Sequence, residues 1–99
     1  MSVGMFLQMP GGTREFYDAV LTELDWDARE KPRGFISHYA GSTEDGWLVF
    51  DVWESRDDFH RFLDERLAAA VQAASGGQAP SFEPQFVEIH REDHAAARV

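Results

Sequence analysis

His38 is the residue of this sequence best suited to proton-transfer chemistry. It lies among apolar and strand-forming residues in the stretch 34–41, where an imidazole must find a partner or change its protonation. A histidine in such a place can act as a general acid or base near neutral pH. Asp51 is the candidate to orient it, because a carboxylate within the apolar run 47–53 needs a compensating donor. The alternatives are structural: His38 hydrogen-bonded at a rim, and Asp51 paired with an arginine across a dimer.

Four aromatic residues are candidates for contact with a flat ligand. Trp47 and Trp53 could form the stacking walls of a pocket, although packing is the simpler role for Trp53 at the end of its strand. Tyr17 and Tyr39 could each donate a phenolic proton to a substrate oxygen. Because side chains alternate along a strand, Tyr39 and His38 point to opposite faces unless the strand carries a bulge.

The elements that must position these residues follow from the patterning of the chain. Strand-forming residues occupy 3–9, 34–41, 47–53 and 86–90, and apolar residues at helical spacing predict a helix after Thr13 and a longer one after Ser55. Ser55, with Asp58 three residues on, has the form of a capping box, and Gly76 and Gly77 end the long helix. The order β-α-β-β-α-β predicts an α+β, ferredoxin-like fold with a four-stranded antiparallel sheet and its helices on one face.

The other face of that sheet needs a cover. Along the run 47–53, we expect Leu48, Phe50 and Val52 to face the helices. The opposite face then carries four residues, two of them tryptophans: Trp47, Val49, Asp51 and Trp53. Since two exposed tryptophans are too much apolar surface to leave in water, we expect a second copy of the chain to pack there. Two sheets face to face would form a dimeric α+β barrel with a cavity in each protomer.

Composition excludes several classes of partner and site. Ninety-nine residues are enough for one domain, which we place at 1–90, with a flexible tail at 91–99. The net charge of −9 opposes binding to nucleic acid or to an anionic membrane surface, and no apolar run approaches the roughly 20 residues of a membrane span. The chain has no cysteine, which excludes disulfides and thiolate chemistry. We expect a cytoplasmic homodimer.

Several of these segments together resemble a known family. The hairpin 34–41 and 46–55, followed by residues 59–62 and by Arg66 and Leu67, resembles the small dimeric α+β barrel proteins of the antibiotic-biosynthesis monooxygenase superfamily. The resemblance covers residues 3–90 and is most specific at the junction Trp53, Glu54, Ser55. It implies binding of a hydrophobic, aromatic or polyketide-like molecule and, for an enzyme, oxygenation of an electron-rich phenol or anthrone without a cofactor.

The superfamily also contains members with other roles, so alternatives stay open. One is a non-catalytic ligand-binding or accessory module, and another is a cyclase, isomerase or lyase that uses His38 and Asp51 without oxygen. Haem-degrading members carry Trp where this chain has Phe62 and an axial His where it has Gln72. The resemblance therefore implies no haem. The spacing of the four histidines places no metal-ligand set on one face of a helix or strand.

Overall fold

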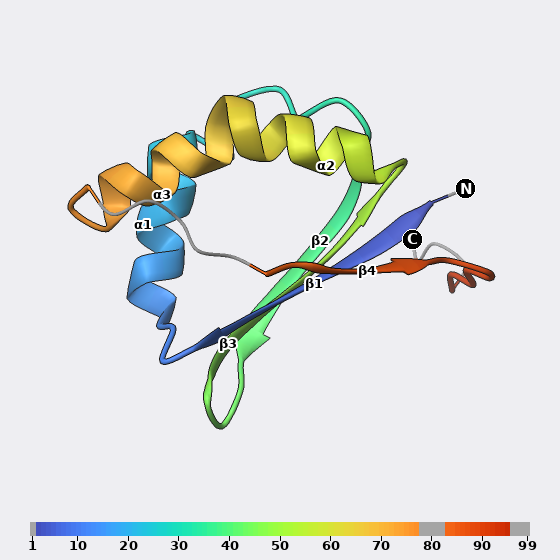
Figure 1. Cartoon of the computed structure of the whole chain (residues 1–99), viewed down its shortest axis with the longest axis horizontal. Coiled ribbons are helices and arrows are strands. Elements are labelled where there is room, and N and C mark those ends of the chain that lie inside the picture. The colour runs from blue at the N-terminus through green and yellow to red at the C-terminus, as the bar shows by residue number, and fades with distance from the viewer. Residues whose placement is uncertain (1, 78–82, 96–99) are drawn as a thin grey trace.

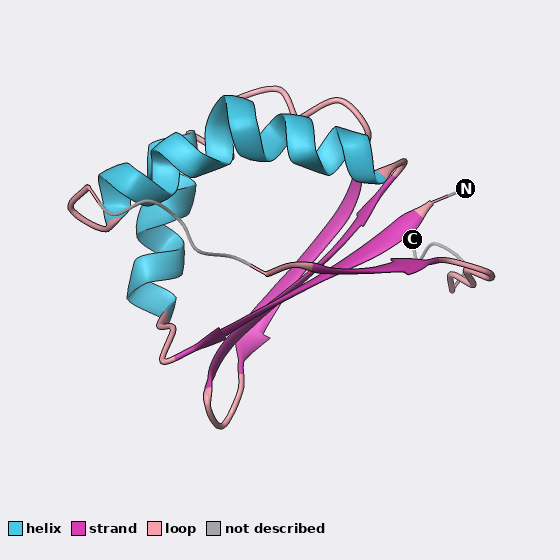
Figure 2. Ribbon diagram, viewed as in Figure 1, coloured by secondary structure: helices cyan, strands magenta, loops and turns pink. Residues whose placement is uncertain are grey.

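The computed structural model describes residues 2–77 and 83–95, and it shows one layer of helices on one face of a sheet (Figures 1 and 2). The elements are, in chain order, β1 (Val3–Pro10), α1 (Arg14–Leu24), β2 (Phe35–Ser42), β3 (Gly46–Trp53), α2 (Arg56–Phe62), the π-helical turn η1 (Leu63–Leu67), α3 (Ala68–Ala74) and β4 (Gln85–Glu88). The four strands pair antiparallel in the order β2-β3-β1-β4. The predicted α+β, ferredoxin-like arrangement is confirmed.

The ends of the described chain differ a little from expectation. The last strand begins one residue earlier than predicted and ends at Glu88. Residues 91–95 form neither helix nor strand, and the remainder of the predicted tail lies outside the described residues. No helix within residues 2–77 and 83–95 has the length and apolar character that crossing a bilayer requires.

Both predicted helix starts carry the expected caps. The backbone N–H of Phe16 donates to Thr13 Oγ1 at 3.1 Å, and that of Asp58 donates to Ser55 Oγ at 3.2 Å. These hydroxyls accept from first-turn amides that have no partner within their own helix. The caps therefore fix the residues at which the chain leaves the sheet and α1 and α2 begin.

The long second helix is not uniform. A single helix was expected after Ser55, but the π-helical turn η1 separates α2 from α3. A π turn widens the helix by one residue per turn, which shifts the buried face without breaking the chain of backbone bonds. Phe59 and Phe62 before it, and Ala70 and Val71 after it, are all buried. The apolar residues whose spacing predicted the helix are therefore buried on both sides of η1. That spacing did not predict the π turn.

The prediction of which sheet face meets the helices is wrong. Trp53 is fully buried, with its ring centroid 5.7 Å from that of Phe59 and 5.5 Å from that of Phe62, both on α2. The set Trp47, Val49, Asp51 and Trp53 thus faces the helices. The alternation along β3 was predicted correctly, but both sets are apolar enough to face a core. The set that carries the two largest rings, those of Trp47 and Trp53, is the one that packs against the core between the sheet and the helices.

The opposite set forms the uncovered face of the sheet, which we call the outer face. The ring of Phe50 lies 4.8 Å from that of Phe6 and 6.2 Å from that of Tyr39. Phe6 is 37% exposed, Tyr39 60% and Val87 49%. The helices lie on the other face of the sheet (Figure 2). The outer face therefore presents aromatic and aliphatic side chains to solvent.

Gly34 provides a test of how β2 is joined to α2. Its φ of +84° is in the left-handed region, and a Cβ there would overlap the carboxylate of Asp58 at the start of α2. We expect Gly34→Ala to lower the free energy of unfolding by about 1–3 kcal/mol. Urea unfolding measures it, with Gly41→Ala as the matched control because a Cβ at Gly41 meets no atom within 4 Å. Equal unfolding midpoints for the two variants would contradict this reading.

Candidate functional site

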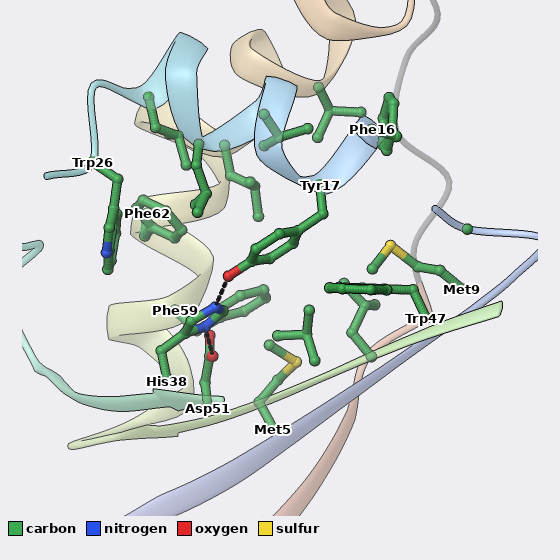
Figure 3. Close-up of a pocket in the computed structure, with 18 of the residues that line it drawn as sticks. Met5, Met9, Phe16, Tyr17, Trp26, His38, Trp47, Asp51, Phe59 and Phe62 are labelled. Carbon is green, nitrogen blue, oxygen red and sulfur yellow. Dashed lines mark hydrogen bonds and ion pairs between the residues drawn. The ribbon is translucent and has the colours of Figure 1, made fainter. Parts of the chain in front are cut away.

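A pocket of about 80 Å³ lies between the helix layer and the sheet (Figure 3). Every element from β1 to α3 contributes to its walls, which are mainly aliphatic and aromatic. Its polar groups are few: the side chains of Thr13, Tyr17, His38 and Asp51, and the indole nitrogens. An apolar cavity with a small number of converging polar groups is the usual form of a small-molecule site. It lies within one chain, on the helix side of the sheet.

Asp51 anchors the polar groups of the pocket. Its side chain is buried, and its Oδ1 lies 2.5 Å from His38 Nδ1 while its Oδ2 accepts from Trp53 Nε1 at 3.1 Å. The expected partnership of His38 and Asp51 is confirmed in position, because the β2–β3 register sets these two residues opposite each other. The arginine partner considered for Asp51 is replaced by the imidazole and the indole.

His38 is hydrogen-bonded at both ring nitrogens. An ionised carboxylate can only accept, so Nδ1 carries a hydrogen and Nε2 is left as the acceptor of the neutral ring. Nε2 lies 2.5 Å from the hydroxyl oxygen of Tyr17, which donates to it. Asp51 thereby sets the tautomer of His38, and His38 sets the direction of the Tyr17 hydroxyl (Figure 3).

Tyr17 reaches this position from the second turn of α1. The pKa of its phenol is raised above the usual 10.0, first because burial disfavours the charged form and then because the carboxylates of Asp51, Asp18 and Asp27 repel it. The hydroxyl therefore stays protonated and serves as a hydrogen-bond donor. Of the two tyrosines predicted from the sequence, this is the one that the structure brings to His38.

Trp47 and Trp26 form aromatic walls on either side of this chain of hydrogen bonds. The ring of Trp47 lies 5.2 Å from that of Tyr17, and its Nε1 is buried with no hydrogen-bond partner among the described residues. Trp26 follows the end of α1 and lies 6.2 Å from the ring of His38. Sequence reasoning missed Trp26, and the only available signal was a tryptophan close to the apolar spacing that predicts the first helix.

Tyr39 is not part of the pocket. It was predicted as a possible ligand contact, but it lies on the outer face, stacked against Phe50. The expected alternation of Tyr39 and His38 accounts for this, since the one bulge in β2 falls between Phe35 and Ser37 and leaves the later residues in regular alternation. Trp53 touches the pocket but is mainly a core residue, as its position suggested.

Comparison with known proteins gives matches in structure. No family model and no curated protein matches the sequence. A candidate antibiotic biosynthesis monooxygenase from Chloroflexus aurantiacus is 18% identical, with a TM-score of 0.61 over 98% of this chain and 100% of that chain. A monooxygenase from the gene ActVA-Orf6 of Streptomyces coelicolor, in complex with the ligand nanaomycin D, is 16% identical, with a TM-score of 0.59 over 96% and 92%.

A further match is SnoaB, a cofactor-independent oxygenase from Streptomyces nogalater, at 21% identity and a TM-score of 0.52 over 92% of each chain. The chain has the fold of the antibiotic biosynthesis monooxygenases. The resemblance found in the sequence is thus confirmed at the level of the fold. Identities this low carry no information on substrate, so the chemistry of this chain must be argued from its own pocket.

The raised pKa of Tyr17 can be measured directly. Tyr39→Phe leaves Tyr17 as the single tyrosine of the chain, so the tyrosinate absorbance then reports one group. We expect its midpoint above pH 10.0 in the folded protein and near 10.0 in urea. The stability that this group contributes is complete below pH 10.0 and is lost as the pH rises through the folded value. A folded-state midpoint at or below 10.0 would show that Tyr17 is neither buried nor close to Asp51.

Proposed function

We propose that the protein binds a hydrophobic, aromatic or polyketide-like small molecule in this pocket and oxygenates it without a cofactor. The observation that carries the proposal is the chain of hydrogen bonds from Trp53 through Asp51 and His38 to Tyr17, at the wall of an otherwise apolar cavity. Such a chain is suited to move a proton to or from a bound phenol. The nanaomycin D complex and the cofactor-independent oxygenase among structures of this fold support this substrate class.

The reaction requires only a phenol or anthrone, dioxygen and a base. The hydrogen-bonded chain of Tyr17, His38 and Asp51 takes up the acidic proton of the substrate, and the resulting electron-rich anion passes one electron to dioxygen. Recombination of the carbon radical with superoxide forms a C–O bond, and the protonated peroxide then loses water to leave a carbonyl. One dioxygen is consumed: one oxygen atom enters the product and the other leaves as water. The substrate loses two hydrogens, and the base recovers its resting state.

The walls of the pocket supply orientation and charge stabilisation. The rings of Trp47 and Trp26 can hold a planar substrate beside the hydroxyl of Tyr17. The unpartnered Nε1–H of Trp47 is suited to donate to the substrate oxygen that gains negative charge. In an apolar cavity such a donor stabilises an anion more strongly than water-exposed groups do, because the local dielectric constant is low.

Oxygen uptake with anthrone tests the proposal. We expect one dioxygen consumed per anthrone converted to anthraquinone, and we expect His38→Gln to lower the rate by roughly 10²–10⁴-fold. His60→Gln is the matched control, since His60 is exposed on α2. The rate of oxygen uptake by this variant should equal that of the wild type. Anthrone binding without oxygen uptake would point instead to a binding module. An isomerised or cyclised product formed without oxygen from a polyketide-like substrate would point to a cyclase or isomerase.

We also propose that the protein is a homodimer formed through the outer face. Trp47 and Trp53 face the helices and do not form this interface. The outer face instead presents Phe6, Tyr39 and Val87, which are between 37% and 60% exposed on one side of the sheet. Two such faces packed together would remove this apolar surface from water and would leave the pocket of each protomer on the outside of the sheet pair.

Light scattering at micromolar concentration tests the assembly. We expect a mass about twice the 11.2 kDa of the chain. Phe6→Glu should shift the mass toward the monomer, because a charge would be buried against the partner's sheet. Gln72→Glu adds the same charge at an exposed position on α3 and should leave the dimer intact. A monomeric wild-type protein would remove the outer face as an interface.

A further inference from the structure

We propose that Tyr17, and not His38, is the residue that takes the proton from the bound ligand, and that His38 acts only through Tyr17. This inference rests on the proposed function, which supplies a phenolic ligand, and it assigns the group that touches it. Tyr17 is then the catalytic residue. His38 receives the proton that Tyr17 gives up, and Asp51 stabilises the imidazolium that forms; we call these three residues the relay.

Both ring nitrogens of His38 are hydrogen-bonded within the protein, so neither is free for a ligand. Nδ1 lies 2.5 Å from Asp51 Oδ1, and Nε2 lies 2.5 Å from the Tyr17 hydroxyl oxygen. The carboxylate of Asp51 cannot move away easily, because Trp53 holds its other oxygen and the group is buried. A ligand would reach Nε2 only by displacing Tyr17, whose ring lies against Trp47 in the wall of the pocket (Figure 3).

The hydroxyl oxygen of Tyr17 can still accept a hydrogen bond from a ligand. A phenolic hydroxyl donates one hydrogen bond and has further acceptor capacity, and here its hydrogen is directed at His38 Nε2. Tyr17 and Trp47 both line the pocket, and their ring centroids lie 5.2 Å apart. A ligand hydroxyl placed against Tyr17 can donate to its oxygen while the Tyr17 hydrogen stays directed at His38.

The proton balance of the relay is complete. The ligand O–H bond breaks as a new O–H bond forms at Tyr17, while the original Tyr17 hydrogen moves to His38 Nε2. Tyr17 ends as a neutral phenol, the ligand as an anion, and His38 as an imidazolium beside the carboxylate of Asp51. Burial and the charge of Asp51 raise the pKa of Tyr17, so a free tyrosinate is disfavoured and the two transfers must be coupled.

A ligand that cannot be oxygenated separates proton transfer from oxygen chemistry. We choose a hydroxyanthraquinone, which is already a quinone and whose phenol and phenolate differ in colour. Bound to the wild type, it should titrate at a pH about 1–2 lower than when free, because its anion lies near the imidazolium. Tyr17→Phe and His38→Gln should both abolish this difference. Tyr39→Phe, the matched tyrosine change outside the pocket, should retain it.

The outcomes separate the relay from the proposed function. Thermal unfolding and the dissociation constant of the dye establish that each variant is folded and still binds. If Tyr17→Phe keeps the wild-type titration while His38→Gln loses it, His38 takes the proton directly and the relay is wrong. A wild type that binds the dye without changing its titration also overturns the relay. If the dye ionises as expected but anthrone drives no oxygen uptake, the relay stands and the oxygenase proposal fails.

Discussion

The buried carboxylate of Asp51 is the group on which the rest of the site depends. An ionised side chain in the middle of an apolar strand is costly to bury unless donors compensate its charge. Here the donors are the imidazole of His38 and the indole of Trp53, one for each oxygen. The same two bonds hold His38 in one tautomer and orient it toward Tyr17. The donors that compensate the buried charge of Asp51 therefore also order the chain of hydrogen bonds that ends at Tyr17.

That chain of hydrogen bonds lies at the wall of the pocket between the helices and the sheet. Wide rings fill part of the gap: Trp53 packs on Phe59 and Phe62, and Trp26 closes the side nearest His38. The π turn η1 adjusts the long helix so that residues on both sides of it stay buried. Arg66, within η1, donates to the backbone oxygen of Glu30 in the segment that carries Trp26. The aromatic wall and the irregular helix are therefore connected parts of one arrangement.

The two faces of the sheet have different physical roles. The inner face combines large aromatic rings with the buried polar chain, whereas the outer face carries exposed apolar side chains that no helix among residues 2–77 and 83–95 covers. Structures of this fold include a cofactor-independent oxygenase and a complex with nanaomycin D, yet identities of 16–21% leave the side chains of each pocket free to differ. The fold supplies the cavity, and the residues that line it decide what chemistry it can perform.

Much of this protein was determined by local sequence. Strand alternation, helical spacing and the hydroxyl caps of Thr13 and Ser55 predicted the order of elements, because each depends on neighbours within a few residues. The pairing of His38 with Asp51 followed from adjacent strands of one hairpin. The face of β3 that meets the helices could not be read, because both of its sets are apolar and alternation alone does not distinguish them. Tyr17 and Trp26 joined His38 only in the folded chain, since segments far apart in sequence meet there through packing that no local pattern encodes.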